Sequence, residues 1–209
     1  MIVFVVALAG VMAGAIHVLA GADHLAAVVP LAAADRRPAW RAGLRWGLGH
    51  AGGVTIVALL AFGLREVVPL ETLTSWSERM VGVTLIAIGA WALTGARRTP
   101  RQRDGARPHA PVHTHGRQRA AIFVGLLHGT AGGSHILGVI PVLALPTRAA
   151  ALGYLTGFGA GTVVAMALFA SVVGAVSARF ALAGPRAWAG FLRGCGATSI
   201  AVGVFWLAP

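Results

Sequence analysis

Ionisable side chains that can bind a metal ion stand inside apolar stretches of this 209-residue chain. They are five histidines and one aspartate: His17, Asp23, His24, His50, His128 and His135. An ionisable group in lipid is costly, so such residues usually face the interior of a helix bundle and serve a function there. Imidazole nitrogen suits divalent nickel, cobalt, zinc and copper. The pattern predicts a divalent-metal site whose single carboxylate offsets only part of the ion's charge, so that the ion is not trapped.

The two stretches that carry most of these residues match each other. HVLAGADHLAAVVP (17–30) aligns with HGTAGGSHILGVIP (128–141), and both histidines, one glycine and the proline of each recur 111 positions apart. The match continues from GLGHAGG (47–53) to GFGAGTV (157–163), 110 positions apart, and from TLIAIG (84–89) to TSIAVG (198–203), 114 apart. His50 has no counterpart, since Ala160 stands in its place. The repeat predicts two structurally related halves.

Each half must bend its first span for the histidines to meet. On a straight helix His17 and His24 share a face but lie about 10.5 Å apart along the axis, whereas metal–nitrogen bonds are about 2 Å long. We therefore predict a helix break at Gly21, where Asp23 can cap the new helix. The predicted breaks and kinks are Gly21, Pro30, Gly132, Gly133 and Pro141. The competing interpretations are histidines that only hydrogen-bond between helices, an aspartate that is only a cap, and a His50 that only packs.

Composition describes the elements that must hold these residues. The chain is 57% hydrophobic and 11% charged, which excludes an ordinary soluble domain. The six apolar blocks lie at about 2–34, 42–64, 79–96, 119–146, 149–177 and 187–207. We predict an all-α polytopic membrane protein with six transmembrane helices, arranged as two inverted three-helix repeats whose first and fourth helices are broken. Inverted repeats with broken helices and a midplane site are typical of secondary transporters.

The arginines predict the orientation. All 17 basic residues are arginine, and they concentrate in the connections between spans one and two, three and four, and five and six. The positive-inside rule places these connections in the cytoplasm and both termini outside. The first block lacks a positive n-region, so we expect a retained span rather than a secretory signal. Because the arginines lie between apolar blocks, the net charge of +11 does not indicate nucleic-acid binding.

The predicted organisation is a first repeat at 1–96, a cytoplasmic loop at 97–118 and a second repeat at 119–209. The loop is polar, rich in arginine and expected to be disordered. Its His109, His113 and His115 form a candidate accessory metal loop, and a plain solvated loop is the equal alternative. One cysteine, Cys195, excludes a thiolate metal cage. Most tryptophans fall near span ends, as interfacial anchors do.

Three segments of the chain can be compared with known families: HVLAGADHLAAV, RWGLGHAGGV and LLHGTAGGSHILGVIPVLALPTRAAALGYLTGFGAGTV. Together they resemble the nickel/cobalt permease superfamily, in particular its six-span urease-accessory type. The resemblance implies movement of nickel or cobalt across a cytoplasmic membrane. The superfamily's signature is a histidine followed, after a short spacer, by Asp-His. The resemblance assigns this signature to His17, Asp23 and His24. Five residues separate the first histidine from Asp-His here, where the signature has four. The resemblance extends to thiol-disulfide carriers, which need two intramembrane cysteines where this chain has one. It also extends to sulfite and amino-acid exporters, which would not need five buried histidines.

We therefore expect a secondary transporter of nickel, and next of cobalt, in a bacterial or archaeal cytoplasmic membrane. The chain has no GxxxxGK[ST] motif for ATP hydrolysis, and we expect neither an enzyme nor a prosthetic group. The bilayer, the metal ion and a cytosolic metallochaperone are the candidate partners. Two alternatives stay open at this point: a haem-binding electron carrier with histidine axial ligands, and an exporter of a small anion or metabolite.

Overall fold

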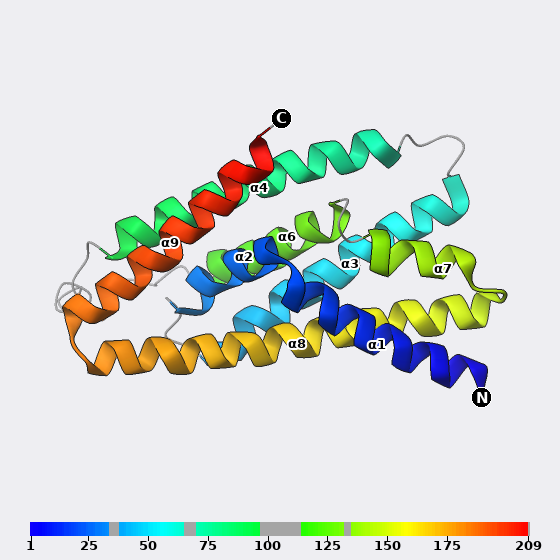
Figure 1. Ribbon diagram of the computed structural model, residues 1–209, viewed down its shortest axis with the longest axis horizontal. Helices are drawn as coiled ribbons and strands as arrows, with labels where there is room; N and C mark the ends of the chain where they lie inside the picture. Colours follow the sequence, from blue (N-terminus) through cyan, green and yellow to red (C-terminus); the bar gives the residue numbers. More distant parts are fainter. Residues whose placement is uncertain (34–37, 65–69, 97–113, 132–134, 209) are drawn as a thin grey trace.

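The computed structural model describes residues 1–33, 38–64, 70–96, 114–131 and 135–208, and all their regular structure is helical (Figure 1). The elements are α1 (Ile2–Ala20), α2 (Ala22–Ala33), α3 (Trp40–Leu64), α4 (Leu70–Ala96), α6 (Thr114–Thr130), the π-helix η1 (His135–Val139), α7 (Ile140–Ala144), α8 (Arg148–Leu182) and α9 (Pro185–Leu207). No strand occurs in these ranges. The all-helical prediction is confirmed for them.

Four of the described helices are long and apolar enough to cross a membrane. They are Ile2–Ala20, Trp40–Ala61, Arg148–Leu182 and Pro185–Leu207. These helices match the first, second, fifth and sixth predicted spans, so the chain is a membrane protein. The third predicted span lies in α4, which also contains Glu78 and Arg79, and the fourth is divided among α6, η1 and α7. The full six-span inverted arrangement stays a prediction.

Glycines four residues apart let the long helices approach closely. α1 packs on α8, and α3 packs on α6. The paired glycines are Gly10 and Gly14 on α1, Gly157 and Gly161 on α8, Gly49 and Gly53 on α3, and Gly125 and Gly129 on α6. A Cβ on Gly14 would collide with the carbonyl oxygen of Phe158, and a Cβ on Gly125 with that of Trp46. Such backbone contact is how small residues bind membrane helices together.

α4 and α9 form a third close pair (Figure 1). A Cβ on Gly82 would lie 2.9 Å from the carbonyl oxygen of Gly203, and one on Gly203 would lie 2.7 Å from that of Gly82. Gly89 and Gly196 face each other in the same reciprocal way. The buried Ser199 hydroxyl also donates to the carbonyl of Leu85 at 2.8 Å, so this pair has a polar contact inside its interface.

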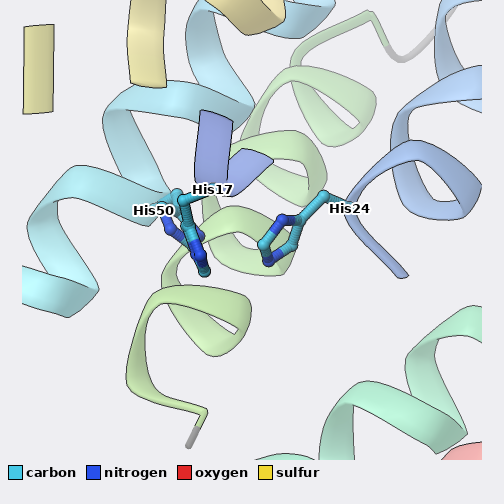
Figure 2. Close-up of side chains that lie close together, drawn as sticks. All are labelled: His17, His24 and His50. Atoms are coloured by element: carbon cyan, nitrogen blue, oxygen red, sulfur yellow. The ribbon is translucent and has the colours of Figure 1, made fainter. Parts of the chain in front are cut away.

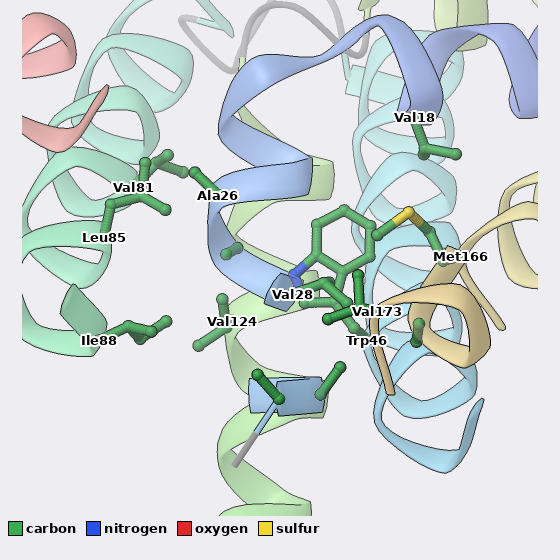
Figure 3. Close-up of a cluster of buried hydrophobic side chains, with 14 of the residues drawn as sticks. Val18, Ala26, Val28, Trp46, Val81, Leu85, Ile88, Val124, Met166 and Val173 are labelled. Atoms are coloured by element: carbon green, nitrogen blue, oxygen red, sulfur yellow. The ribbon is translucent and has the colours of Figure 1, made fainter. Parts of the chain in front are cut away.

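Two clusters of buried apolar side chains fill the interior. The Trp46 cluster (Figure 3) includes Val18, Val28, Trp46, Val124, Met166 and Val173. The Phe158 cluster includes Val54, Val57, Val139, Val142, Tyr154 and Phe158. On α3, Trp46, His50 and Val54 follow one another at intervals of four residues and so lie on one face. His50 is therefore located between the two clusters.

Candidate metal centre

A one-residue break between α1 and α2 shapes the centre. Gly21 lies between the two helices with φ −76° and ψ 105°, an extended conformation. Its N–H still donates to the carbonyl of His17, and its carbonyl accepts from the N–H of Leu25, both at 3.1 Å. A Cβ at Gly21 would collide with the imidazole ring of His24. The missing side chain therefore leaves room for that ring beside the turn.

Three buried imidazoles converge at this break (Figure 2). His17 comes from the last turn of α1, His24 from the first turn of α2, and His50 from α3. One ring nitrogen from each lies within 4.8 Å of the others. The ring centroids are 4.7 Å apart for His17 and His24, 5.3 Å for His17 and His50, and 5.0 Å for His24 and His50. Bonds of about 2 Å to one ion would require these nitrogens to draw slightly closer.

Two of the three imidazoles, those of His24 and His50, have ring nitrogens without a hydrogen-bond partner in the described part of the chain. Neither nitrogen of His50 has one, nor does Nδ1 of His24. Both side chains are nearly or fully withdrawn from the surface, with exposures of 0% for His50 and 4% for His24. Buried polar atoms are nearly always hydrogen-bonded in folded proteins. A coordinated cation would satisfy these lone pairs, so the donor set fits a metal ion.

Asp23 and His128 border the three imidazoles. Asp23 is buried, and its Oδ2 lies 3.5 Å from Nε2 of His24. The Nδ1–H of His128 donates to the carbonyl of Val124 at 2.8 Å, which leaves the lone pair of the neutral ring on Nε2. The His128 and His24 ring centroids are 5.8 Å apart. These two residues offer a negative charge and a further nitrogen at the edge of the cluster.

A cavity of about 250 Å³ opens onto the cluster. Its lining comprises His17, Ala20, Gly21, Asp23, His24, His128, Ala131, Leu137 and Trp206. The fully buried His50 does not line this cavity although it contacts two histidines that do. An ion entering through the cavity would therefore meet Asp23, His17 and His24 before it reached His50.

The second repeat is also interrupted near its predicted motif. α6 ends at Thr130 and η1 begins at His135, whereas Gly132 and Gly133 lie outside the described residues and the side chain of His135 is not described. Pro141 is in the first turn of α7 and has no N–H for the carbonyl four residues before it, that of Leu137. The Tyr154 hydroxyl donates to that carbonyl at 2.7 Å. In the first repeat, by contrast, α2 continues through Pro30 to Ala33.

The loop histidines remain a prediction. His109 and His113 lie outside the described residues, and His115 belongs to α6 but its side chain is not described. The structure therefore brings together His17, His24 and His50 with Asp23 and His128 beside them, while His135 and the loop stay untested.

Two aromatic residues at the centre were not expected from the sequence. Trp46 is fully buried and lies in ring contact with His24, His50 and His128. Phe158 is also fully buried, and its ring centroid is 5.6 Å from that of His17. Unlike an interfacial anchor, Trp46 points into the core. Its position four residues before His50, on the same helix face, was the signal available in the sequence.

Comparisons with known proteins find three relatives. The chain is 34% identical over 174 residues to "Chloroplast protein FOR GROWTH AND FERTILITY 2" of Arabidopsis thaliana, covering 80% of this chain and 46% of that protein. It is 32% identical over 180 residues to the same plant's "Chloroplast protein FOR GROWTH AND FERTILITY 1", covering 80% and 49%. It is 28% identical over 165 residues to "Urease accessory protein UreH" of Bacillus sp. (strain TB-90), covering 73% and 69%.

The chain thus spans about half the length of the two chloroplast proteins that it matches. No known protein-family model matches it, and no solved structure does. The expected superfamily is supported only through the distant similarity to UreH.

Proposed function

We propose that the chain is a secondary transporter that moves a divalent transition-metal ion, nickel before cobalt, through the centre formed by His17, His24 and His50. The observation that carries this proposal is the convergence of three buried imidazoles, each with a nitrogen within 4.8 Å of the others, at a helix break in a membrane protein. Buried ionisable groups in membrane proteins usually mark the path of a substrate or ion.

The donor set favours an ion of intermediate softness. Imidazole nitrogens suit nickel, cobalt and zinc, and a site without thiolate ligands disfavours copper(I). The carboxylate of Asp23 supplies one negative charge against two positive ones, so the loaded site keeps a positive charge. Preference for nickel rests on the resemblance to the urease-accessory transporters and on the 28% identity to UreH.

Helix pairing supports the inverted repeat that such a transporter would use. Gly82 and Gly89 recur 114 positions later as Gly196 and Gly203. Gly82 packs against Gly203, the repeat of Gly89, and Gly89 packs against Gly196, the repeat of Gly82. In the repeat, α1 corresponds to α6 and α3 corresponds to α8. The contact between α1 and α8 therefore has its equivalent in the contact between α6 and α3. A two-fold axis in the membrane plane would produce both patterns.

The two apolar clusters support alternating access as the mechanism. His50 contacts Trp46 on one side and is followed on α3 by Val54 of the Phe158 cluster, while His17 contacts Phe158. An apolar cluster therefore flanks the centre in each direction along α3, while the cavity opens onto His17, Asp23 and His24. We propose that the clusters part in turn, which would connect the centre to one side of the membrane at a time.

Neither alternative function is favoured by the geometry. A porphyrin ring would lie between its two axial imidazoles, but the imidazoles here contact one another directly, with centroids 4.7 to 5.3 Å apart. An anion path would not place the carboxylate of Asp23 in the lining of its cavity. We propose a carrier with no enzymatic activity and no prosthetic group.

The proposed setting is a bacterial or archaeal cytoplasmic membrane with both termini outside and a cytosolic metallochaperone as partner. Its driving force would be the membrane potential, proton exchange or a metal sink.

Transport into vesicles tests the proposed function. The purified chain is reconstituted in liposomes that contain a metal-sensitive dye, and uptake of Ni²⁺, Co²⁺ and Zn²⁺ is followed with and without a pH gradient. We expect saturable Ni²⁺ uptake that falls at least about tenfold in His17→Ala, because one of three converging ligands is lost. Thr156→Ala is the control, since this exposed α8 hydroxyl donates to carbonyl groups of its own helix, those of Leu152 and Gly153.

Uptake by His17→Ala at the unaltered rate would show that this centre does not carry the ion. The transport proposal itself would be overturned if the unaltered, correctly folded chain took up none of the three ions, either with or without a pH gradient.

A further inference from the structure

Trp46 touches three of the four buried histidines near the centre. Its ring stacks on His50 with centroids 5.0 Å apart and an angle of 13° between the planes. It meets His24 edge-on at 5.3 Å and 61°, and His128 at 5.4 Å and 62°. The contact with His50 is the parallel one, and it joins neighbours on the same face of α3.

His50 lacks the support that a metal-binding histidine normally has. Such a histidine usually donates its second N–H to a carboxylate, carbonyl or water, which fixes the ring's orientation and makes it a stronger ligand. Neither nitrogen of His50 has such a partner in the described part of the chain. Of the ring contacts that His50 makes in that part, the one with Trp46 is close to parallel, at 13°, whereas those with His17 and His24 are at 33° and 73°.

The buried indole of Trp46 lowers the stability of the fold in a way that an apolar side chain at the same position would not. The Nε1–H of Trp46 is buried without an acceptor among the described residues, although buried tryptophans usually hydrogen-bond this group. Leucine or methionine could fill an apolar core without leaving a donor unpaired. Packing alone therefore does not account for the indole, whereas its flat face against His50 does.

We propose that Trp46 is the positioning residue of the metal centre: its indole face holds the His50 ring toward His17 and His24. Because the stack provides no hydrogen-bond acceptor, His50 remains a weak ligand and is the one that yields when the ion leaves. This inference rests on the proposed function and deepens it, since it names the residue that sets how His50 binds and releases the ion.

Ni²⁺ titration calorimetry of the full, detergent-purified chain tests the proposal. His109, His113 and His115 are replaced by alanine in all samples so that the loop adds no sites. On this background Trp46→Leu is expected to bind Ni²⁺ about tenfold more weakly, the lower end of the range for lost support of a ligand. Trp46→Phe keeps a flat aromatic face and is expected to stay within about threefold of the background chain.

A double-mutant cycle distinguishes positioning from general packing. If Trp46 acts through His50, then Trp46→Leu combined with His50→Ala binds no more weakly than His50→Ala alone, because coupled residues are not additive. Trp188→Leu is the matched control: it removes another buried tryptophan of the same apolar cluster, one that lies on α9 and not on α3. It is expected to leave Ni²⁺ affinity unchanged.

Each result has a defined meaning. Unchanged affinity in Trp46→Leu, or additive losses in the double mutant, overturns the positioning role while leaving the transport proposal intact. Absence of Ni²⁺ binding by both the natural and the background chain overturns the transport proposal, and this inference with it. If Trp46→Leu does not purify as a single species, Trp46→Met replaces it with the same expectations.

Discussion

At the scale of single residues, the imidazoles of the centre are held in two different ways. His128 donates through Nδ1 to a backbone carbonyl at 2.8 Å, so its tautomer is set. His50 has no such bond among the described residues and is held by stacking. The centre therefore has a firmly oriented imidazole, His128, at its edge and a more adaptable one, His50, at the position farthest from the cavity. This combination suits the proposed transport, in which an ion must both enter and leave.

The charge of Asp23 is predicted to set the affinity. Asp23→Asn keeps the shape of the side chain but removes the one carboxylate that lines the cavity among the described residues. At an effective dielectric constant of about 20, a charge a few ångström from a cation is worth several kcal/mol. We therefore expect Ni²⁺ affinity to fall by at least about tenfold in calorimetry.

Glu78→Gln is the control for Asp23→Asn, because it removes a carboxylate of α4 that lies outside the cavity lining. Equal losses in the two variants would mean that Asp23 acts through the net charge of the protein and not at the centre.

At the scale of elements, close helix contact brings the ligands together. Gly125 on α6 lies against the backbone of Trp46 and His50 on α3. Gly129 lies against the carbonyl of His50 in the same way. Any side chain at these points would push α6 away from α3, and with it His128 away from Trp46. The glycines thus determine the width of the centre as well as the packing of two helices.

Gly125→Ala is predicted to lower both stability and Ni²⁺ affinity. Its Cβ would collide with the carbonyl oxygen of Trp46, and overpacking of this kind typically costs about 1–3 kcal/mol. We expect a lower melting temperature in detergent and a weaker Ni²⁺ titration. Gly194→Ala on α9 is the control, since no atom of the described residues lies within 4 Å of a Cβ at this position and alanine favours the helix. A Gly125→Ala protein as stable as Gly194→Ala would contradict the packing argument.

At the scale of the whole molecule, the break between α1 and α2 lies near the middle of the long axis (Figure 1). The ends of α8 lie far apart along the same axis (Figure 1). If this axis crosses the bilayer, the histidines lie near its midplane and the ends of α8 lie on opposite sides.

Orientation is tested with single cysteines at the ends of α8 and α9. Arg148→Cys and Arg186→Cys are introduced separately into a Cys195→Ser chain. Position 148 is the first residue of α8, position 186 is the second residue of α9, and both are exposed. The positive-inside rule places position 148 outside and position 186 in the cytoplasm. We expect a membrane-impermeant maleimide to label only the first in intact cells and both after permeabilisation. Labelling of both in intact cells would contradict the predicted topology.

The sequence by itself determined the helical class, the membrane setting and the place of the first break. These depend on local properties: long apolar runs, the lack of a side chain at Gly21, and ionisable residues where lipid disfavours them. The two histidines and the aspartate of the first motif could be selected from the sequence on the same ground, and all three are buried at the break.

Only the tertiary structure decided which of these residues meet. That His50 joins His17 and His24, that Trp46 stacks on it, and that Phe158 contacts His17 all depend on how α1, α3 and α8 cross. Those crossings are set where glycines on one helix contact the backbone of another helix that is distant in the chain. Periodicity shows which face of a helix a residue occupies, but not which helix that face meets, because the partner is chosen by packing across the whole bundle.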